Sequence, residues 1–252
     1  MFHTVMISAI GLGLASLVGS AIGMFVKNIS HRLNDIFLGF CAGMMLAASI
    51  VCLIMPAIGM VPTSGLWQII AGVAAGVALI GALDYVTPHL HRLTGLDIEE
   101  HSNNRHSVNR VLLFVLAIAL HKLPEGMATG IVFEGPDQQN AIAVSLTIAL
   151  QNIPEGMVVV TPLIMIGMSY LRTSLVALAV AAIEVAGVYI GFALGGISEM
   201  MLPFLLAMAG GAMLYVISDE MIPETHSHGF EKYATYALIA GVMTMLLIEN
   251  LG

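Results

Sequence analysis

Long apolar runs, each about 20 residues in length, recur from one end of this chain to the other. A run of this length crosses a lipid bilayer as a helix, which makes all its backbone hydrogen bonds internally. Of the 252 residues, 58% are hydrophobic and 10% are charged, whereas about a quarter of a soluble domain is charged. The sequence therefore predicts an all-α integral membrane protein with a single transmembrane domain over residues 1–252. Its eight expected spans lie near residues 4–26, 35–58, 66–88, 110–133, 139–161, 171–195, 201–222 and 231–250.

The lysine and arginine positions predict how these spans are oriented. Basic residues are enriched in the cytoplasmic loops of membrane proteins, and seven of the eight here lie in the first, third, fifth and seventh loops. We therefore expect both termini to be extracytoplasmic, in a multi-pass protein of the cell membrane. The longest loop, 89–109, is cytoplasmic in this topology and has too little apolar content to form a core. The seven residues are Lys27, Arg32, Arg92, Arg105, Arg110, Arg172 and Lys232.

Three further features of the sequence narrow the class of protein. The formal net charge of −8, with few and scattered basic residues, gives no indication of nucleic-acid binding. Cys41 and Cys52 fall in one expected span and predict no disulfide framework. The first apolar run has no basic segment before it, so we interpret it as a membrane helix rather than a cleaved signal.

One short phrase occurs twice, in the fourth and fifth expected spans. Ala119-Leu-His-Lys-Leu-Pro-Glu-Gly-Met127 recurs 30 residues later as Ala149-Leu-Gln-Asn-Ile-Pro-Glu-Gly-Met157. A carboxylate inside a membrane span costs about 2.5–3.5 kcal/mol on insertion scales, so such residues usually have a function. The proline of each phrase removes a helical hydrogen bond, and the freed carbonyl must find another partner in the bilayer. The two spans run in opposite directions, so the sequence predicts an antiparallel pair of kinked helices.

The residue types of the two phrases predict an ion site near the middle of the membrane. His121 and Glu125 are four residues apart and share a helix face, as do Gln151 and Glu155. Met45 is expected at the same depth, in the second span. Imidazole, carboxylate, amide and thioether groups together suit a divalent transition ion better than calcium or magnesium. Zinc is the first candidate, because it accepts mixed ligands.

Each of these residues also has a purely structural interpretation. A buried histidine or glutamine commonly forms hydrogen bonds between helices, and Met45 is one of 18 methionines in the chain. Lys122 and Glu125 are three residues apart and could form a structural ion pair. Glu184, in the sixth span, has no residue nearby in sequence to neutralise it. The joint occurrence of two matched phrases and a third mid-membrane glutamate favours the ion site.

With the phrase His121-x-x-Pro124-Glu125-Gly126, its partner in the fifth span and eight expected helices, the chain resembles the ZIP (Zrt-, Irt-like) metal transporters. The short prokaryotic and GufA-like members are the most similar. The resemblance implies import of a divalent metal, zinc foremost, with Fe²⁺, Mn²⁺ or Cd²⁺ as alternatives. It also implies movement of one helix bundle against another, and a homodimer. By position, it places the primary ion site at Met45, His121, Glu125, Gln151 and Glu155.

The resemblance also implies positions for a second ion, and here this sequence departs from the family. Lys122 stands where an asparagine is usual, and Asn152 where some relatives have an aspartate. With Glu125, Glu155 and Glu184 ionised, Lys122 and one divalent ion make the site neutral, whereas a second ion would be uncompensated. We therefore expect that Lys122 replaces the second metal. A neutral Lys122 that relays protons is the alternative. The second-site positions are Lys122, Asn152 and Glu184, together with Glu125 and Glu155.

Another polar group is expected at the cytoplasmic ends of the third and seventh spans. Carboxylates and imidazoles there could form an exit site for the ion, or they could simply anchor the helix ends in the interface. The histidines of the 89–109 loop could sense metal, or they could be exposed to solvent without any role in metal binding. The candidate exit residues are Asp84, His89, Asp219, Glu220, Glu224, His226 and His228.

Other function classes remain to be weighed against zinc import. Iron or manganese import uses the same ligand types, because ligand chemistry only ranks these metals. A proton-coupled carrier of a solute other than a metal would use the lysine and the glutamates. An intramembrane zinc protease needs a His-Glu-x-x-His helix, and the sequence has none, so we expect no enzyme activity.

Overall fold

The computed structural model describes residues 2–25, 30–93, 119, 122–198, 200–227 and 229–251. Throughout these residues the chain forms helices joined by short turns, with no β-strand among them, which confirms the all-α prediction. Residues 122–132 are helical, and we refer to them as the 122–132 helix. The other helices are α1 (Phe2–Phe25), α2 (His31–Ala47), η1 (Ala48–Ile54), α3 (Met55–Gly59), η2 (Thr63–Gly65), α4 (Leu66–Leu93), α6 (Gln138–Met165), α7 (Tyr170–Gly195), α8 (Leu202–Val216), η3 (Ile217–Met221), α9 (Ile222–Thr225) and α10 (Glu231–Leu251).

Seven segments of the described chain are long and apolar enough to cross a membrane. They match seven of the eight expected spans. The remaining expected span, 110–133, is described only at 119 and 122–133, so the eighth crossing stays a prediction. The seven segments are Phe2–Phe25, Arg32–Gly59, Thr63–Ala82, Gln138–Ile164, Tyr170–Gly195, Leu202–Thr225 and Glu231–Glu249.

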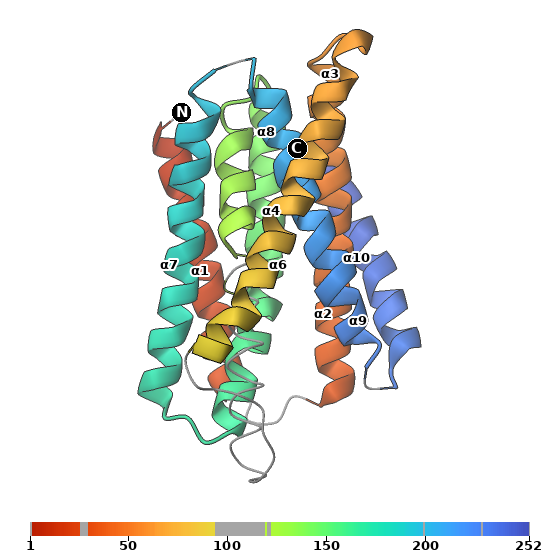
Figure 1. The fold of residues 1–252 in the computed structure, drawn as a ribbon. Helices are drawn as coiled ribbons and strands as arrows, with labels where there is room; N and C mark the ends of the chain where they lie inside the picture. Colours follow the sequence, from red (N-terminus) through yellow and green to blue (C-terminus); the bar gives the residue numbers. More distant parts are fainter. Residues whose placement is uncertain are drawn as a thin grey trace.

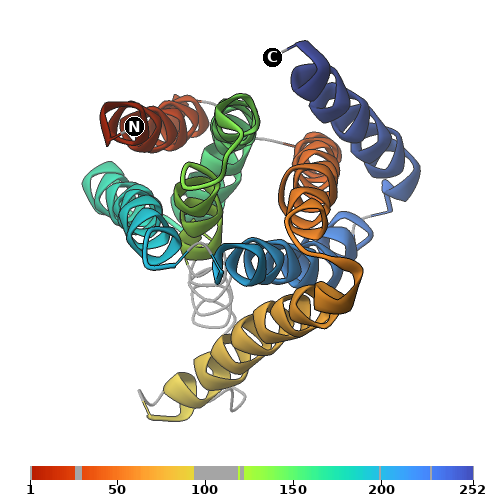
Figure 2. The same ribbon diagram turned by 90° about the horizontal axis from the view of Figure 1, so that it is seen from above.

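The helices are arranged in two groups that lie side by side (Figures 1 and 2). The first bundle contains α1, the 122–132 helix, α6 and α7. The second bundle contains α2, α4, α8 and α10, with the short helices α3 and α9. Both described chain ends lie toward the same end of the molecule (Figure 1).

Glycines bring helices of the same bundle into close backbone contact. A Cβ at Gly19 of α1 would overlap the backbone of Ile153 in α6, and one at Gly43 of α2 would overlap that of Leu238 in α10. Among the described residues, every glycine whose added Cβ would come within 3.0 Å of another helix has that neighbour in its own bundle. Small residues let membrane helices approach closely and pack by van der Waals contact. Each bundle is therefore tightly packed within itself.

Two spans of the second bundle contain a π-helical segment that ends two residues before a proline. The π-helix η1 precedes Pro56, and η3 precedes Pro223. Proline has no N–H and clashes with the carbonyl four residues earlier, so the wider π turn relieves the crowding. The carbonyl of Cys52, four residues before Pro56, accepts a hydrogen bond from Asn140 Nδ2 of α6 at 3.0 Å. The first bundle thus contacts the second at this broken turn.

The 122–132 helix and α6 run in opposite directions. The turn at 133–137 joins them, and residue 122 lies opposite 155 while residue 125 lies opposite 151. Pro154 and Pro162 lie within the continuous helix α6. The expected kink at each repeated phrase stays a prediction.

Gly19 and Gly11 of α1 offer a test of the packing within the first bundle. We expect Gly19→Ala to lower the free energy of unfolding by about 1–3 kcal/mol, because the methyl group overpacks the contact with α6. Gly11 has no atom within 4 Å of its added Cβ, so Gly11→Ala should leave stability unchanged or raise it by up to about 1 kcal/mol. Equilibrium unfolding in detergent micelles measures both. Equal effects of the two substitutions would contradict the packing described.

Candidate metal centre

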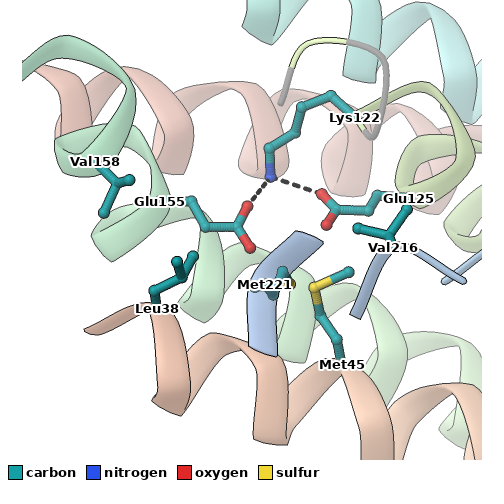
Figure 3. Close-up of a pocket in the computed structure, with 8 residues that line it drawn as sticks. All are labelled: Leu38, Met45, Lys122, Glu125, Glu155, Val158, Val216 and Met221. Atoms are coloured by element: carbon teal, nitrogen blue, oxygen red, sulfur yellow. Dashed lines mark hydrogen bonds and ion pairs between the residues drawn. The ribbon is translucent and has the colours of Figure 1, made fainter. Parts of the chain in front are cut away.

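The ammonium group of Lys122 is the centre of a buried polar cluster (Figure 3). Its Nζ donates to Glu125 Oε2 at 2.6 Å, to Asn152 Oδ1 at 2.5 Å and to Glu155 Oε2. An ammonium group has three N–H donors, and these three acceptors match them. Lys122 and Glu125 are each 2% exposed. The charges are therefore paired with one another, away from water.

Glu184 of α7 is the third carboxylate of the cluster. Its Oε1 accepts from Asn152 Nδ2 at 2.7 Å and lies 3.9 Å from Lys122 Nζ, while its Oε2 accepts from Ser16 Oγ of α1 at 2.9 Å. Asn152 Nδ2 also contacts the carbonyl of Leu12 at 3.3 Å. All four helices of the first bundle thus contribute to one hydrogen-bonded network.

The repeated phrases explain why these side chains meet. Lys122 and Glu125 are three residues apart and lie on one face of their helix. The antiparallel arrangement places the second phrase opposite the first, which brings Glu155 to Lys122. A Cβ at Gly126 would overlap the backbone carbonyl of Glu184, so the glycine of the first phrase lets α7 approach. The first phrase therefore brings together side chains from three helices, namely its own helix, α6 and α7.

A small cavity lies beside the cluster and receives a sulfur from the second bundle. Its volume is about 30 Å³, close to the share of one water molecule in the liquid, about 30 Å³. The Met45 thioether extends toward the carboxylates of Glu125 and Glu155 (Figure 3). The other residues that line the cavity are Leu38, Lys122, Val158, Val216 and Met221. One ion without a hydration shell would fit this space.

Gln151 presents an oxygen without a partner next to Glu125. The residue is completely buried, and its Oε1 has no hydrogen-bond partner in the described part of the structure. Its Nε2 donates to Glu125 Oε1 at 3.3 Å. A buried acceptor that is left unsatisfied is costly, so Gln151 Oε1 is a candidate ligand atom.

The structure thus brings together most of the residues expected at the ion sites. Met45, Glu125 and Glu155 line one cavity, and Gln151 contacts Glu125. His121 lies outside the described residues. Within the described chain, no three His, Cys, Asp or Glu residues gather as the ligands of a metal would. The carboxylates gather around Lys122 instead. Lys122, Asn152 and Glu184, the three second-site positions, belong to one hydrogen-bonded network.

The candidate exit residues are less fully described. Asp219 and Glu220 lie on η3 and Glu224 on α9. His226 is exposed, and its Nδ1 lies 2.7 Å from the carbonyl oxygen of Ile222. The end of α4, which carries Asp84 and His89, diverges from η3 and α9 in both views (Figures 1 and 2). The side chains of Asp84 and His89, and the whole of His228, lie outside the described residues.

Two polar residues of interest were missed by the sequence analysis. Ser16 donates to Glu184, and Asp35 of α2 is completely buried. Ser16 and Ser20 are four residues apart in an apolar span, which could have indicated a polar face on α1. Asp35 was placed at the boundary of the second span and so was not treated as a carboxylate within the membrane.

Comparison with known proteins shows the family to which this chain belongs. The family model described as ZIP Zinc transporter matches residues 84–249. The chain belongs to the ZIP family. The zinc transporter ZIPB of Bordetella bronchiseptica is 38% identical over 94% of this chain and 77% of its own length. The zinc transporter GufA of Myxococcus xanthus is 35% identical over 96% of this chain and 99% of its own, and human ZIP11 is 27% identical over 92% of each.

Membership of this family confirms the resemblance seen in the sequence. The family is one of metal-ion transporters, and its apolar helices are those of a multi-pass membrane protein. The buried cluster lies on the repeated phrases that carry the resemblance. The chain is therefore similar in sequence to zinc transporters through the segments that build its candidate metal centre.

Ser16 and Ser20 provide a matched test of the network. Ser16→Ala leaves Glu184 Oε2 without its hydroxyl donor, and we expect the free energy of unfolding to fall by about 1–3 kcal/mol. Ser20 donates to the carbonyl of Ser16 within α1, so Ser20→Ala should change stability by less than about 0.5 kcal/mol. Equilibrium unfolding in detergent compares the two. A Ser16→Ala protein as stable as the Ser20→Ala protein would show that the Ser16 hydroxyl is dispensable.

Proposed function

We propose that this protein imports a divalent transition metal, zinc foremost, into the cytoplasm by alternating access at the candidate metal centre. The observation that carries the proposal is that Lys122 contacts only one carboxylate oxygen of each glutamate in the repeated phrases. The lysine contacts Oε2 of Glu125 and Oε2 of Glu155, which leaves for an ion the Oε1 of Glu155 and, beside its contact with Gln151 Nε2, the Oε1 of Glu125. The relatives described above, which are named zinc transporters, support zinc as the substrate.

The ligands proposed for the transported ion come from both bundles. Glu125, Glu155 and Gln151 supply oxygens, Met45 supplies a thioether, and His121 supplies an imidazole. Zinc accepts such mixed ligands in a roughly tetrahedral arrangement, and the sulfur and imidazole disfavour calcium and magnesium. Fe²⁺, Mn²⁺ and Cd²⁺ are the alternative substrates, because ligand chemistry ranks these ions without excluding them.

We propose further that the site holds one metal ion, because Lys122 occupies the place of a second. The positive charge of Lys122 and of one divalent ion equals the negative charge of Glu125, Glu155 and Glu184. A second divalent ion would be uncompensated in a buried site, where an unpaired charge is costly. Asn152 already accepts from Lys122 and donates to Glu184. Three acceptors around Nζ favour a charged ammonium over the neutral amine of a proton relay.

Alternating access is supported by how the two bundles are held together. Glycine contacts pack each bundle within itself, whereas the candidate ligands are divided between the two. Met45 comes from the second bundle, and Glu125, Gln151 and Glu155 come from the first. Movement of one bundle against the other would therefore open the site to one side of the membrane and then to the other.

The topology in this proposal has eight spans with both termini extracytoplasmic, in the cell membrane. The positions of the basic residues support this orientation, and an even number of spans agrees with chain ends on one side (Figure 1). A homodimer, which the family resemblance implies, is part of the same proposal.

Zinc uptake into proteoliposomes tests the function. We expect Glu125→Gln to lower uptake by at least about tenfold, because even an outer-shell partner of a metal contributes about 10–100-fold. Glu231→Gln, at an exposed position in the first turn of α10, is the matched control and should transport like the wild type. Uptake that Glu125→Gln does not change would contradict a metal site at the repeated phrases. If the wild type moves neither zinc, iron nor manganese, a carrier for another solute becomes the better interpretation.

A further inference from the structure

A second, larger cavity lies between the two bundles, away from the candidate metal centre. Its volume is about 210 Å³. On α6, Asn140 at this cavity precedes Gln151 at the metal centre by eleven residues, or about 16 Å along the helix axis. The cavity lies toward the extracytoplasmic side in the topology proposed above. Its lining residues are Pro56, Gly59, Met60, Val132, Gly135, Pro136, Asp137, Asn140 and Leu206.

Asn140 gives this cavity an oxygen atom without a partner. The residue is 7% exposed, and its Nδ2 is held by the carbonyl of Cys52 at 3.0 Å. Its Oδ1 has no hydrogen-bond partner among the described residues. Unsatisfied buried acceptors are rare and call for an explanation, such as a bound ion or water. The fixed Nδ2 makes Asn140 a rigid acceptor at the wall of the cavity.

Asp137 adds negative charge at the rim. It is exposed, and its Oδ1 caps α6 by accepting from the backbone N–H groups of Gln139 and Asn140 at 3.0 and 3.1 Å. This carboxylate offsets the positive end of the α6 dipole. The connecting segments 59–65, 133–137 and 196–201 at this end contain no lysine or arginine. The local field therefore favours cations over anions.

The size of the cavity suits a hydrated ion rather than a bare one. At about 30 Å³ for each water molecule, 210 Å³ holds about seven waters, enough for a divalent ion with six. In the described chain, no group of three His, Cys, Asp or Glu residues could bind the bare ion here. Contacts through the ion's own water molecules are the chemistry that one amide oxygen and one carboxylate can provide.

We propose that this cavity captures a hydrated divalent cation before the ion reaches the metal centre. The water molecules of the ion donate to Asn140 Oδ1 and to Asp137. The position of this step in the transport cycle rests on the proposed function, whereas binding of the cation itself does not.

Mn²⁺ is a suitable probe, because electron paramagnetic resonance detects it in a hydrated state. The experiment uses full-length Glu125→Gln protein, in which the metal centre is disabled. We expect it to bind one Mn²⁺ that keeps most of its water. Adding Asp137→Asn should weaken this binding about fivefold through loss of one charge near the ion. Asparagine is as good a helix cap as aspartate, so α6 stays intact.

Glu134→Gln is the matched control, since it removes a charge from the same turn at a residue that does not line the cavity. It should leave Mn²⁺ binding unchanged. The proposal is overturned if the Glu125→Gln protein binds no hydrated Mn²⁺, or if Asp137→Asn and Glu134→Gln weaken binding equally.

Transport measurements separate this proposal from the proposed function. In an otherwise wild-type chain, Asp137→Asn should raise the KM for zinc uptake about fivefold and leave the maximal rate unchanged. An unchanged KM would overturn capture as a step of transport. Loss of all uptake in the wild type would overturn the proposed function, and the Mn²⁺ titration would still decide whether the cavity binds a cation.

Discussion

The pairing of the Lys122 ammonium with buried carboxylates is the interaction on which the rest of this structure depends. Three glutamates within one membrane bundle would repel one another and lack water to solvate them. Lys122 contacts Glu125 and Glu155 directly and lies 3.9 Å from Glu184. The lysine thereby holds the 122–132 helix, α6 and α7 in a fixed arrangement, and α1 joins them through Ser16.

The two bundles contribute different kinds of side chain to the candidate metal centre. The charged groups of this network lie in the first bundle, where glycines allow close backbone contacts. The second bundle contributes mainly apolar side chains to the small cavity, including the sulfur of Met45. The ion pairs of Lys122 all lie within the first bundle, so this bundle can move relative to the other without breaking any of them. That separation is the physical basis of the transport mechanism proposed here.

The sequence predicted much of the first bundle, because the repeated phrases carry strong local signals. Carboxylates in apolar runs and their four-residue spacing indicated that Glu125, Gln151 and Glu155 would meet, and Lys122 was recognised as a cation within the membrane. Ser16 could not be predicted in this way, since it is 168 residues from Glu184 in sequence and serines are ordinary in membrane helices. The π-helical segments were also missed, because the residues before Pro56 and Pro223 are equally typical of an α-helix.

The number of zinc ions bound by each chain tests the central claim most directly. Zinc should be counted by elemental analysis of purified protein, for the wild type and for Lys122→Asn, after dialysis that removes any ion held in the larger cavity only through its water molecules. If the ammonium replaces a second metal, the wild type binds one zinc ion at the buried centre and Lys122→Asn binds two. Two zinc ions in the wild type, or an unchanged count in Lys122→Asn, would contradict the account.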